Sequence, residues 1–261
     1  MKRKLLRILK WGFLIAYLLV IMSFVNREKT KLKCTDTKIL VNGPHHFIND
    51  KTVENLLISN NIKIDSCLID NINFDLIEEI IETNPAVKSA EVYSNFLGEV
   101  FIDIIQRNPI MRIITSNNKH FYVDEYCKLM PVSNTYSANV PVISGHIDPY
   151  FVNYFDSTEN AVQKIKNYTF TPSELFNFVT YLNKSELWKY QIEQIYITED
   201  KEIELVPRIG NHIVIMGDLT NYEYKLNKLI SIYKNGFSLT NWNIYSSINL
   251  KYSNQVICKK R

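Results

Sequence analysis

Residues 37–106 alternate between two hydrophobic periods, which predicts a small α+β unit. A two-residue period, interrupted by the turn residues Asn42-Gly43-Pro44, Asn84-Pro85 and Asn95 to Gly98, is typical of strands. These strands are predicted at 37–41, 87–93 and 99–106. A helical period is predicted to begin near Asn49 or Asp50, and again near Asn73. The resulting order is strand, helix, helix, strand, strand, with both helices on one face of the sheet.

The second helix and the last strand of this unit share a predicted core. Their apolar side chains fall on one helix face and on alternate strand positions, while Glu78, Glu79 and Glu82 fall on the opposite, solvated side of the helix. The predicted core residues are Ile77, Ile80, Ile81, Val100, Ile102 and Ile104.

Beyond Arg107 the pattern becomes mainly β, with short apolar runs between polar or proline-containing turns. Three of these runs, at 192–198, 201–206 and 212–216, are predicted to pair antiparallel. Two helices interrupt the strands. One opens with the capping box of Thr171 and Glu174, and the other carries Leu226 and Leu229 on one face and stops at Gly236.

The segment 242–258 alternates between apolar and polar residues over a long stretch. Ile244, Ile248, Leu250, Tyr252, Val256 and Cys258 take the even positions, and polar residues take most of the odd ones. We expect one long, half-buried strand here. An ordinary terminal strand is the plain interpretation, whereas a free edge that receives another chain by backbone pairing is the functional one.

The N-terminal segment is apolar enough to span a membrane. Residues 5–25 would form a helix of about 31 Å, with Arg7 and Lys10 reaching the headgroups. The competing interpretation is a cleaved signal peptide, but no small-x-small cleavage pattern stands near residues 23–27. The basic tail favours a cytoplasmic N-terminus, although residues 27–38 are basic too.

Charge and composition exclude several classes of protein. Hydrophobic residues make up 46% of the 261 positions and charged residues 22%, which is typical of a globular chain. The net charge of +3 comes from five Lys or Arg in the first 26 residues, so residues 27–261 carry 25 minus 27, or −2. That balance is unlike a nucleic-acid-binding surface.

The candidate chemistry is sparse. His45-His46 has no ligand at metal spacing, the acids Asp65, Asp70 and Asp75 form no evident catalytic pair, and no hydrolase or nucleotide-binding motif occurs. The cysteines lack C-x-x-C spacing, and whether any two pair is left open. They are Cys34, Cys67, Cys127 and Cys258. We therefore expect no catalytic residue, no cofactor and no metal.

Four segments carry a resemblance to a known family: the apolar start, TKILVNGPHHFI, IIETNPAVKSAEVYSNFLGEVFIDIIQRNPIMRI and FYVDEYCKLMPVS. Together they resemble the FtsQ/DivIB family of bacterial division proteins. The most specific local matches are Asn-Pro-x-Val at 84–87 and Gln-Arg-x-Pro at 106–109. Cys127 departs from the family, which often has glycine in this turn. The resemblance covers nearly the whole chain and implies a tail and membrane anchor at 1–26, a POTRA-like domain at 37–106, and a β domain at 107–258.

The resemblance also implies a function. Members of the family are division scaffolds that recruit FtsB-like and FtsL-like proteins through the end of the β domain. The positions that match this region are Tyr245, Ile248, Leu250, Tyr252 and Asn254. The leading hypothesis is thus a non-enzymatic scaffold of the cell inner membrane, with its bulk in the periplasm at the division septum. The alternatives are a POTRA-containing transport or secretion component and an anchored cell-wall enzyme.

Overall fold

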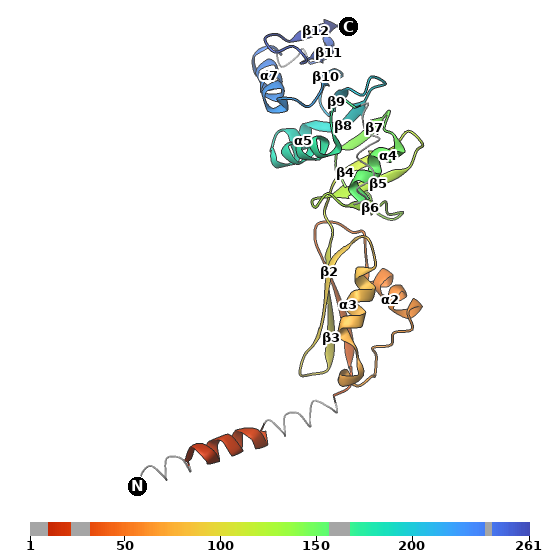
Figure 1. The fold of residues 1–261 in the computed structure, drawn as a ribbon, viewed down its shortest axis with the longest axis vertical. Helices are drawn as coiled ribbons and strands as arrows, with labels where there is room; N and C mark the ends of the chain where they lie inside the picture. Colours follow the sequence, from red (N-terminus) through yellow and green to blue (C-terminus); the bar gives the residue numbers. More distant parts are fainter. Residues whose placement is uncertain (1–9, 22–31, 157–167, 238–241) are drawn as a thin grey trace. The chain divides into compact units, whose positions relative to one another are not determined.

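The structure is a computed structural model of the 261-residue chain, and it describes residues 10–21, 32–156, 168–237 and 242–261 (Figure 1). It divides into two compact units, Met1–Gln106 and Arg107–Arg261. Residues 10–21 are helical. The predicted anchor at 5–25 extends on both sides beyond the described residues. Within the described part of the chain, no helix is both long and apolar enough to cross a membrane.

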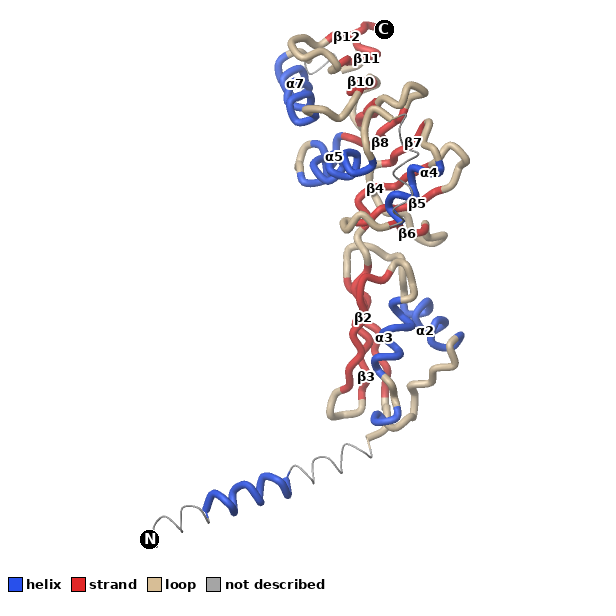
Figure 2. The backbone as a smooth tube through the Cα atoms, in the orientation of Figure 1, coloured by secondary structure: helices blue, strands red, loops and turns tan. Residues whose placement is uncertain are grey.

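The first unit has the predicted order of elements, with one short 3-10 helix added. The elements are β1 (Asp36–Asn42), α2 (Asp50–Ser59), η1 (Ile69–Asn71), α3 (Phe74–Glu82), β2 (Val87–Ser94) and β3 (Glu99–Gln106). The sheet order is β1-β3-β2, in which β3 pairs parallel with β1 and antiparallel with β2. Both α-helices lie on one side of this sheet, as predicted (Figure 2).

Two asparagines begin the helices of this unit. The side chain of Asn49 accepts a hydrogen bond from the N–H of Thr52 at 2.9 Å, and Asn73 accepts from the N–H of Leu76 at 3.1 Å. Each bond satisfies an amide that has no partner within the helix. The predicted helix starts are therefore confirmed.

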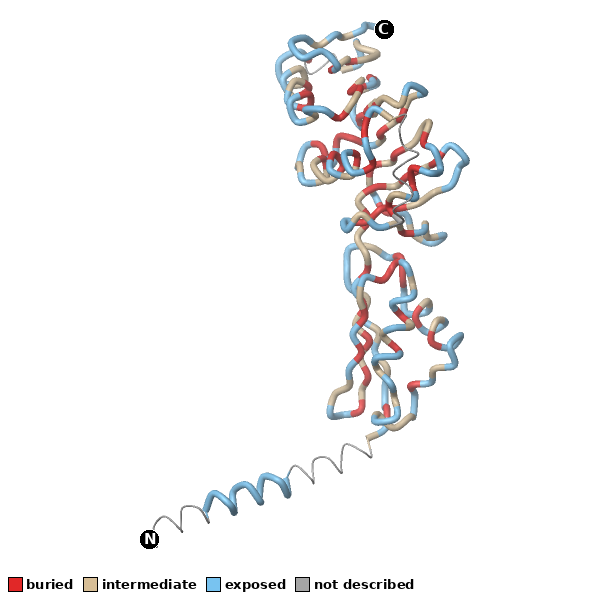
Figure 3. Tube along the Cα trace, in the orientation of Figure 1, coloured by how far each residue is buried: buried red, intermediate tan, exposed pale blue. Residues whose placement is uncertain are grey.

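The core of the first unit is close to the predicted one. Val100, Ile102 and Ile104 of β3 are fully buried, and Ile77 and Ile81 of α3 are buried too. Figure 3 shows buried stretches along the chain of this unit. The exception is Ile80, which is only half-buried. The buried pair is spaced i, i+4, so Ile80 lies to one side of the stripe that faces the sheet.

Two of the three glutamates on α3 bind the sheet instead of facing only solvent. The N–H of Ala90 donates to the Glu82 carboxylate at 3.0 Å, and the N–H of Val92 donates to that of Glu78 at 2.6 Å. Both amides belong to β2, which is an edge strand of the sheet. The expectation that these acids are simply solvated is wrong, because they cover edge amides that would otherwise be open to pairing.

The motif at 106–109 has two separate structural roles. The Gln106 side chain is buried in the first unit, where its oxygen accepts from the N–H groups of Phe47 and Ile48 and its nitrogen donates to the carbonyl of His45. In the second unit, Arg107 pairs with the buried Asp124 at 2.8 Å. Both side chains satisfy polar groups inside their own unit.

The second unit is built on a nine-stranded sheet of order β12-β11-β10-β9-β8-β7-β4-β5-β6. Its strands are β4 (Pro109–Ile114), β5 (His120–Asp124), β6 (Leu129–Pro131), β7 (Val142–Gly145), β8 (Ile192–Ile197), β9 (Ile203–Pro207), β10 (Ile213–Gly217), β11 (Tyr245–Asn249) and β12 (Ile257–Lys260). Its helices are α4 (Pro149–Val152), η2 (Asn153–Asp156), α5 (Pro172–Lys184), α6 (Trp188–Gln191) and α7 (Tyr222–Asn235).

The pairing in this sheet is mainly antiparallel, as predicted, and includes the antiparallel set β8, β9 and β10. Three parallel pairs, β4 with β7, β7 with β8 and β10 with β11, were not predicted. Helices α5 and α7 stand in the connections of the last two pairs, since a parallel pair requires a crossover. The capping box of Thr171 and Glu174 at the start of α5 is confirmed.

Candidate functional site

The segment 242–258 is not one strand, so that prediction is wrong. It contains β11, a loop, and the beginning of β12, which returns antiparallel to β11. The side chain of Asn249 accepts a hydrogen bond from the N–H of Lys251 at 3.0 Å, which turns the chain where β11 ends. The polar run of Ser253 and Asn254 was the available sequence signal for this turn.

The five predicted binding residues fall into two groups. Ile248 and Leu250 are fully buried, so they form part of the core and support the hairpin from within. Tyr245 is half-buried, and its ring stacks on that of Phe237 with centroids 5.5 Å apart. Tyr252 is 48% exposed and Asn254 is exposed, both in the loop. Another chain can therefore reach Tyr245, Tyr252 and Asn254. It cannot reach Ile248 or Leu250.

The free strand edge belongs to β12. Strand β11 is paired on both sides, parallel with β10 and antiparallel with β12. Strand β12 ends the sheet order, and no described strand pairs with its outer edge. A bulge near Ser246 is filled by the serine hydroxyl, which donates to the carbonyl of Lys259 at 3.1 Å. An incoming strand would thus extend the sheet at β12.

The opposite end of the sheet is a poorer place for strand addition. Strand β6 has three residues and ends in Pro131, which has no N–H to donate. Short edge strands and prolines are common means of protecting a sheet edge.

Helix α7 fixes the loop between β11 and β12. The ammonium of Lys228 donates to the carbonyls of Leu250 at 3.2 Å and of Tyr252 at 2.5 Å, and the hydroxyl of Tyr224 donates to the carbonyl of Ser253 at 2.8 Å. Burial, helped by the nearby positive charge of Lys225, lowers the pKa of Lys228. These contacts hold three carbonyls of the loop against one helix.

The same helix is attached to β10 by a buried lysine, which sequence reasoning missed. Lys225 is buried, and its ammonium donates to the carbonyl of Met216 and to the carboxylate of Asp218 at 3.1 and 2.5 Å. The sequence pattern of α7 predicted that Leu226 is buried, but it gave no reason to expect the neighbouring Lys225 to be buried as well. The ion pair and the carbonyl bonds compensate for its desolvation.

An aromatic cluster packs against the hairpin through Phe237, whose ring stacks on that of Tyr245. The buried His212 has its Nε2 atom 2.9 Å from the hydroxyl oxygen of Tyr233, and it packs against Phe237 and Trp242. Burial lowers the pKa of His212 and raises that of Tyr233. The cluster therefore favours a neutral histidine and a neutral tyrosine beneath Tyr245.

The surface at β12 is positively charged. Lys259, Lys260 and Arg261 are all exposed. The end of the chain is held in place, since the N–H of Arg261 donates to the carbonyl of Ile244 at 3.0 Å and its guanidinium donates to the carbonyl of Asn211. This arrangement suits an acidic segment better than a basic one.

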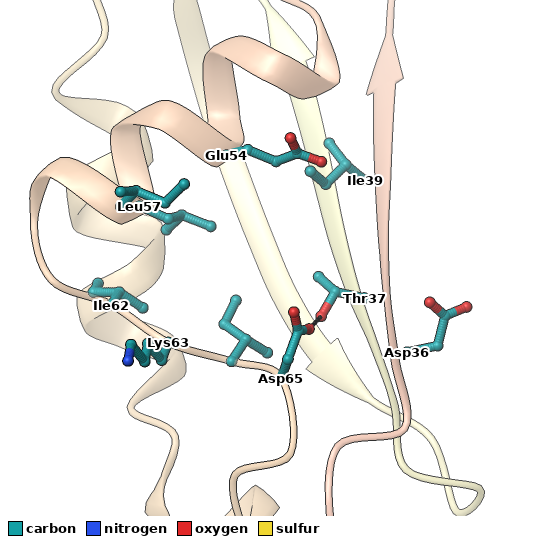
Figure 4. Close-up of a pocket in the computed structure, with 10 residues that line it drawn as sticks. Asp36, Thr37, Ile39, Glu54, Leu57, Ile62, Lys63 and Asp65 are labelled. Atoms are coloured by element: carbon teal, nitrogen blue, oxygen red, sulfur yellow. Dashed lines mark hydrogen bonds between the residues drawn. The ribbon is translucent and has the colours of Figure 1, made fainter.

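A groove in the first unit gathers three acids. It lies beside β1 and α2, encloses about 530 Å³, and is lined by Asp36, Glu54 and Asp65, by Thr37 and Lys63, and by aliphatic side chains (Figure 4). The Thr37 hydroxyl donates to Asp65 at 3.2 Å. No histidine, serine or cysteine is among the described residues that line it, so a nucleophile activated by histidine is not assembled there.

The cysteines and histidines form no reactive or metal-binding group in the described part of the chain. All four cysteines are free thiols, and burial raises the pKa values of Cys127 and Cys258. Higher thiol pKa values reduce the thiolate fraction and hence reactivity. Among the described residues, no three metal-ligating side chains come together.

Comparison with known families agrees with this architecture. A family model described as FtsQ/DivIB, C-terminal related, matches residues 108–259, and one described as a POTRA-like domain matches residues 32–105. The chain belongs to the FtsQ/DivIB family. A search of curated proteins found no match. The FtsQ/DivIB match contains β4 to β11 and all but the last residue of β12, and thus includes the whole candidate surface.

Proposed function

We propose that this FtsQ/DivIB-family chain is a non-enzymatic, membrane-anchored scaffold of the division machinery that binds an extended segment of another division protein at β12. The observation that carries the proposal is the outer edge of β12, with which no strand of the described residues pairs, next to a loop that α7 holds in place. An edge that is already ordered can form backbone hydrogen bonds with a partner without losing further conformational entropy of its own. FtsB-like and FtsL-like proteins are the proposed partners.

The anchor is the second part of this proposal. In the described helix at 10–21, Trp11 is 67% exposed and Phe13 is 77% exposed, and the apolar run continues in the sequence on both sides. Such a helix is stable in lipid, where its backbone groups are satisfied internally. We place the N-terminus in the cytoplasm, the two units in the periplasm, and the protein at the septum of the inner membrane.

The surface residues Tyr245, Tyr252 and Asn254 are proposed to contact the bound segment, and the buried Ile248 and Leu250 to support them. The cations of β12 are proposed to select an acidic segment. Charge complementarity of this kind mainly affects association rate and choice of partner.

A pull-down with purified full-length variants tests this assignment. One test variant combines Lys259→Glu with Lys260→Glu, and a second carries Tyr252→Glu. Each should greatly reduce capture of an FtsB-like partner, because it puts negative charge on the proposed binding surface. All three side chains are exposed, so their replacement should leave the fold intact. Lys234→Glu, at an exposed position on α7, is the control for a lysine-to-glutamate change away from β12. Unchanged capture by both folded test variants would rule out β12 as the binding site.

A further inference from the structure

The turn between β2 and β3 carries two adjacent apolar side chains that are largely exposed. Phe96 is 85% exposed and Leu97 is 72% exposed. Outside the helix at 10–21, no other large hydrophobic side chain of the described residues is as exposed as either of them. Single exposed apolar residues are common, but a neighbouring pair at the tip of a hairpin suggests a binding surface.

Three backbone amides of this turn already have hydrogen bonds. The Asn95 side-chain oxygen accepts from the N–H groups of Leu97 at 2.9 Å and Glu99 at 3.0 Å, and the Asn95 carbonyl accepts from the N–H of Gly98 at 3.2 Å. Gly98 has φ +86°, and a Cβ there would lie 2.4 Å from the carbonyl oxygen of Lys33. The tip is therefore fixed in shape, and its paired amides reduce the cost of entering an apolar environment.

The turn also lies where the chain enters the first unit. The N–H of Thr35 donates to the carbonyl of Gly98 at 2.9 Å, and the Thr35 hydroxyl donates to the carbonyl of Leu97 at 3.3 Å. From Val25, where the apolar run ends, to Lys33 there are eight residue steps, which span at most about 28 Å. If residues 5–25 are the anchor, the turn must stay near the membrane surface.

The charges around the turn permit such a contact. Lys38 pairs with Glu99 at 2.6 Å, and the exposed Lys33 and Asp36 offset each other beside them. In the sequence, residues 26–32 add Arg27 and two lysines against one glutamate. Basic residues next to a membrane helix are attracted to anionic headgroups.

We propose that Phe96 and Leu97 insert into the headgroup region of the membrane that holds the anchor, which makes the β2–β3 turn a second lipid contact. The proposal rests on the anchor of the proposed function. Aromatic side chains favour this interfacial layer, which is about 6 Å deep on each side of a bilayer. The partner is a bilayer surface containing anionic lipid.

The test is photo-crosslinking of the full-length chain in vesicles of phosphatidylethanolamine and phosphatidylglycerol. A benzophenone amino acid replaces Phe96 in one protein and Ile105 in the control. Ile105 is 48% exposed and lies at the other end of β3, about 20 Å along the strand from Glu99. We expect lipid adducts by mass spectrometry at position 96 and few at position 105.

The possible failures can be told apart. Vesicle-bound protein without lipid adducts at position 96 would overturn the insertion of the turn while leaving the anchor intact. Protein that does not float with vesicles would overturn the anchor, and the lipid contact with it. Adding Leu97→Glu to the labelled protein should reduce the adduct yield severalfold, and an unchanged yield would show only collisional contact and overturn the proposal.

Discussion

The ammonium of Lys228 lies 2.5 Å from the carbonyl oxygen of Tyr252, and so connects the middle of α7 to the loop that precedes β12. The same ammonium reaches the carbonyl of Leu250, at the end of the segment that pairs with β10. One side chain therefore contacts the loop at two points, and the position of the proposed edge depends on a helix outside the sheet.

Replacing Lys228 with Met should loosen this loop. Methionine keeps most of the apolar stem but loses both hydrogen bonds, and we expect a loss of about 1 kcal/mol in the free energy of unfolding, because the half-buried site is partly screened by solvent. Hydrogen exchange at residues 250–256 should become faster. Lys234→Met, at an exposed position of the same helix, is the control, and equal effects of the two changes would contradict the role given to Lys228.

The first unit offers a test of its core from two neighbouring isoleucines. Ile81→Ala should destabilise the unit by about 2 to 5 kcal/mol, because Ile81 is 1% exposed and its loss leaves a cavity under α3. Ile80→Ala should be clearly milder, since Ile80 is only half-buried. Chemical denaturation measures both, and a larger effect at Ile80 would show that the helix faces the sheet differently.

Cys127 occupies a position that favours glycine. Its φ is +63°, in the left-handed region, where a side chain costs about 1 to 2 kcal/mol. Cys127→Gly should therefore raise the stability of the second unit by up to about 1 kcal/mol, after allowing for the greater freedom of glycine in the unfolded chain. Cys127→Ala separates the conformational effect from loss of the thiol, and should give no gain. A glycine variant less stable than the alanine variant would contradict this interpretation.

His212 should make the second unit sensitive to acid. Its pKa is lowered by burial, so the folded state resists a proton that the unfolded chain accepts near pH 6.5. Stability is full above that pH and should fall as the pH drops below it towards the folded-state value. Unfolding measured between pH 8 and pH 5, compared with His212→Gln, isolates this residue. Parallel pH profiles for the two proteins would exclude the effect.

The local elements of the fold could be predicted because short-range chemistry determines them. Asn49, Asn73 and Thr171 mark helix starts by capping, and the alternation of Val100, Ile102 and Ile104 identifies a strand with one buried face. The family resemblance supplied the expectation of a POTRA-like domain followed by a β domain, but the three parallel strand pairs of the second unit were not predicted.

The candidate site was harder to predict because its arrangement depends on long-range contacts. The alternation across 242–258 hid a turn, since Leu250 is buried by pairing with β10 while Tyr252, two residues later, is exposed. Nothing local shows that Lys225 would be buried with Asp218, or that Lys228 would bind carbonyls 22 and 24 residues away. Nothing local shows either that Glu78 and Glu82 of α3 would bind backbone amides of β2, the next strand in the sequence.

The most direct test of the proposed function is amide hydrogen exchange on the full-length protein, with and without an FtsB-like partner. If the partner adds a strand at β12, slower exchange should appear at Ile257–Lys260, while the opposite edge strand, Leu129–Pro131, stays unchanged. A bound partner that leaves the exchange of Ile257–Lys260 unaltered would contradict strand addition at this edge.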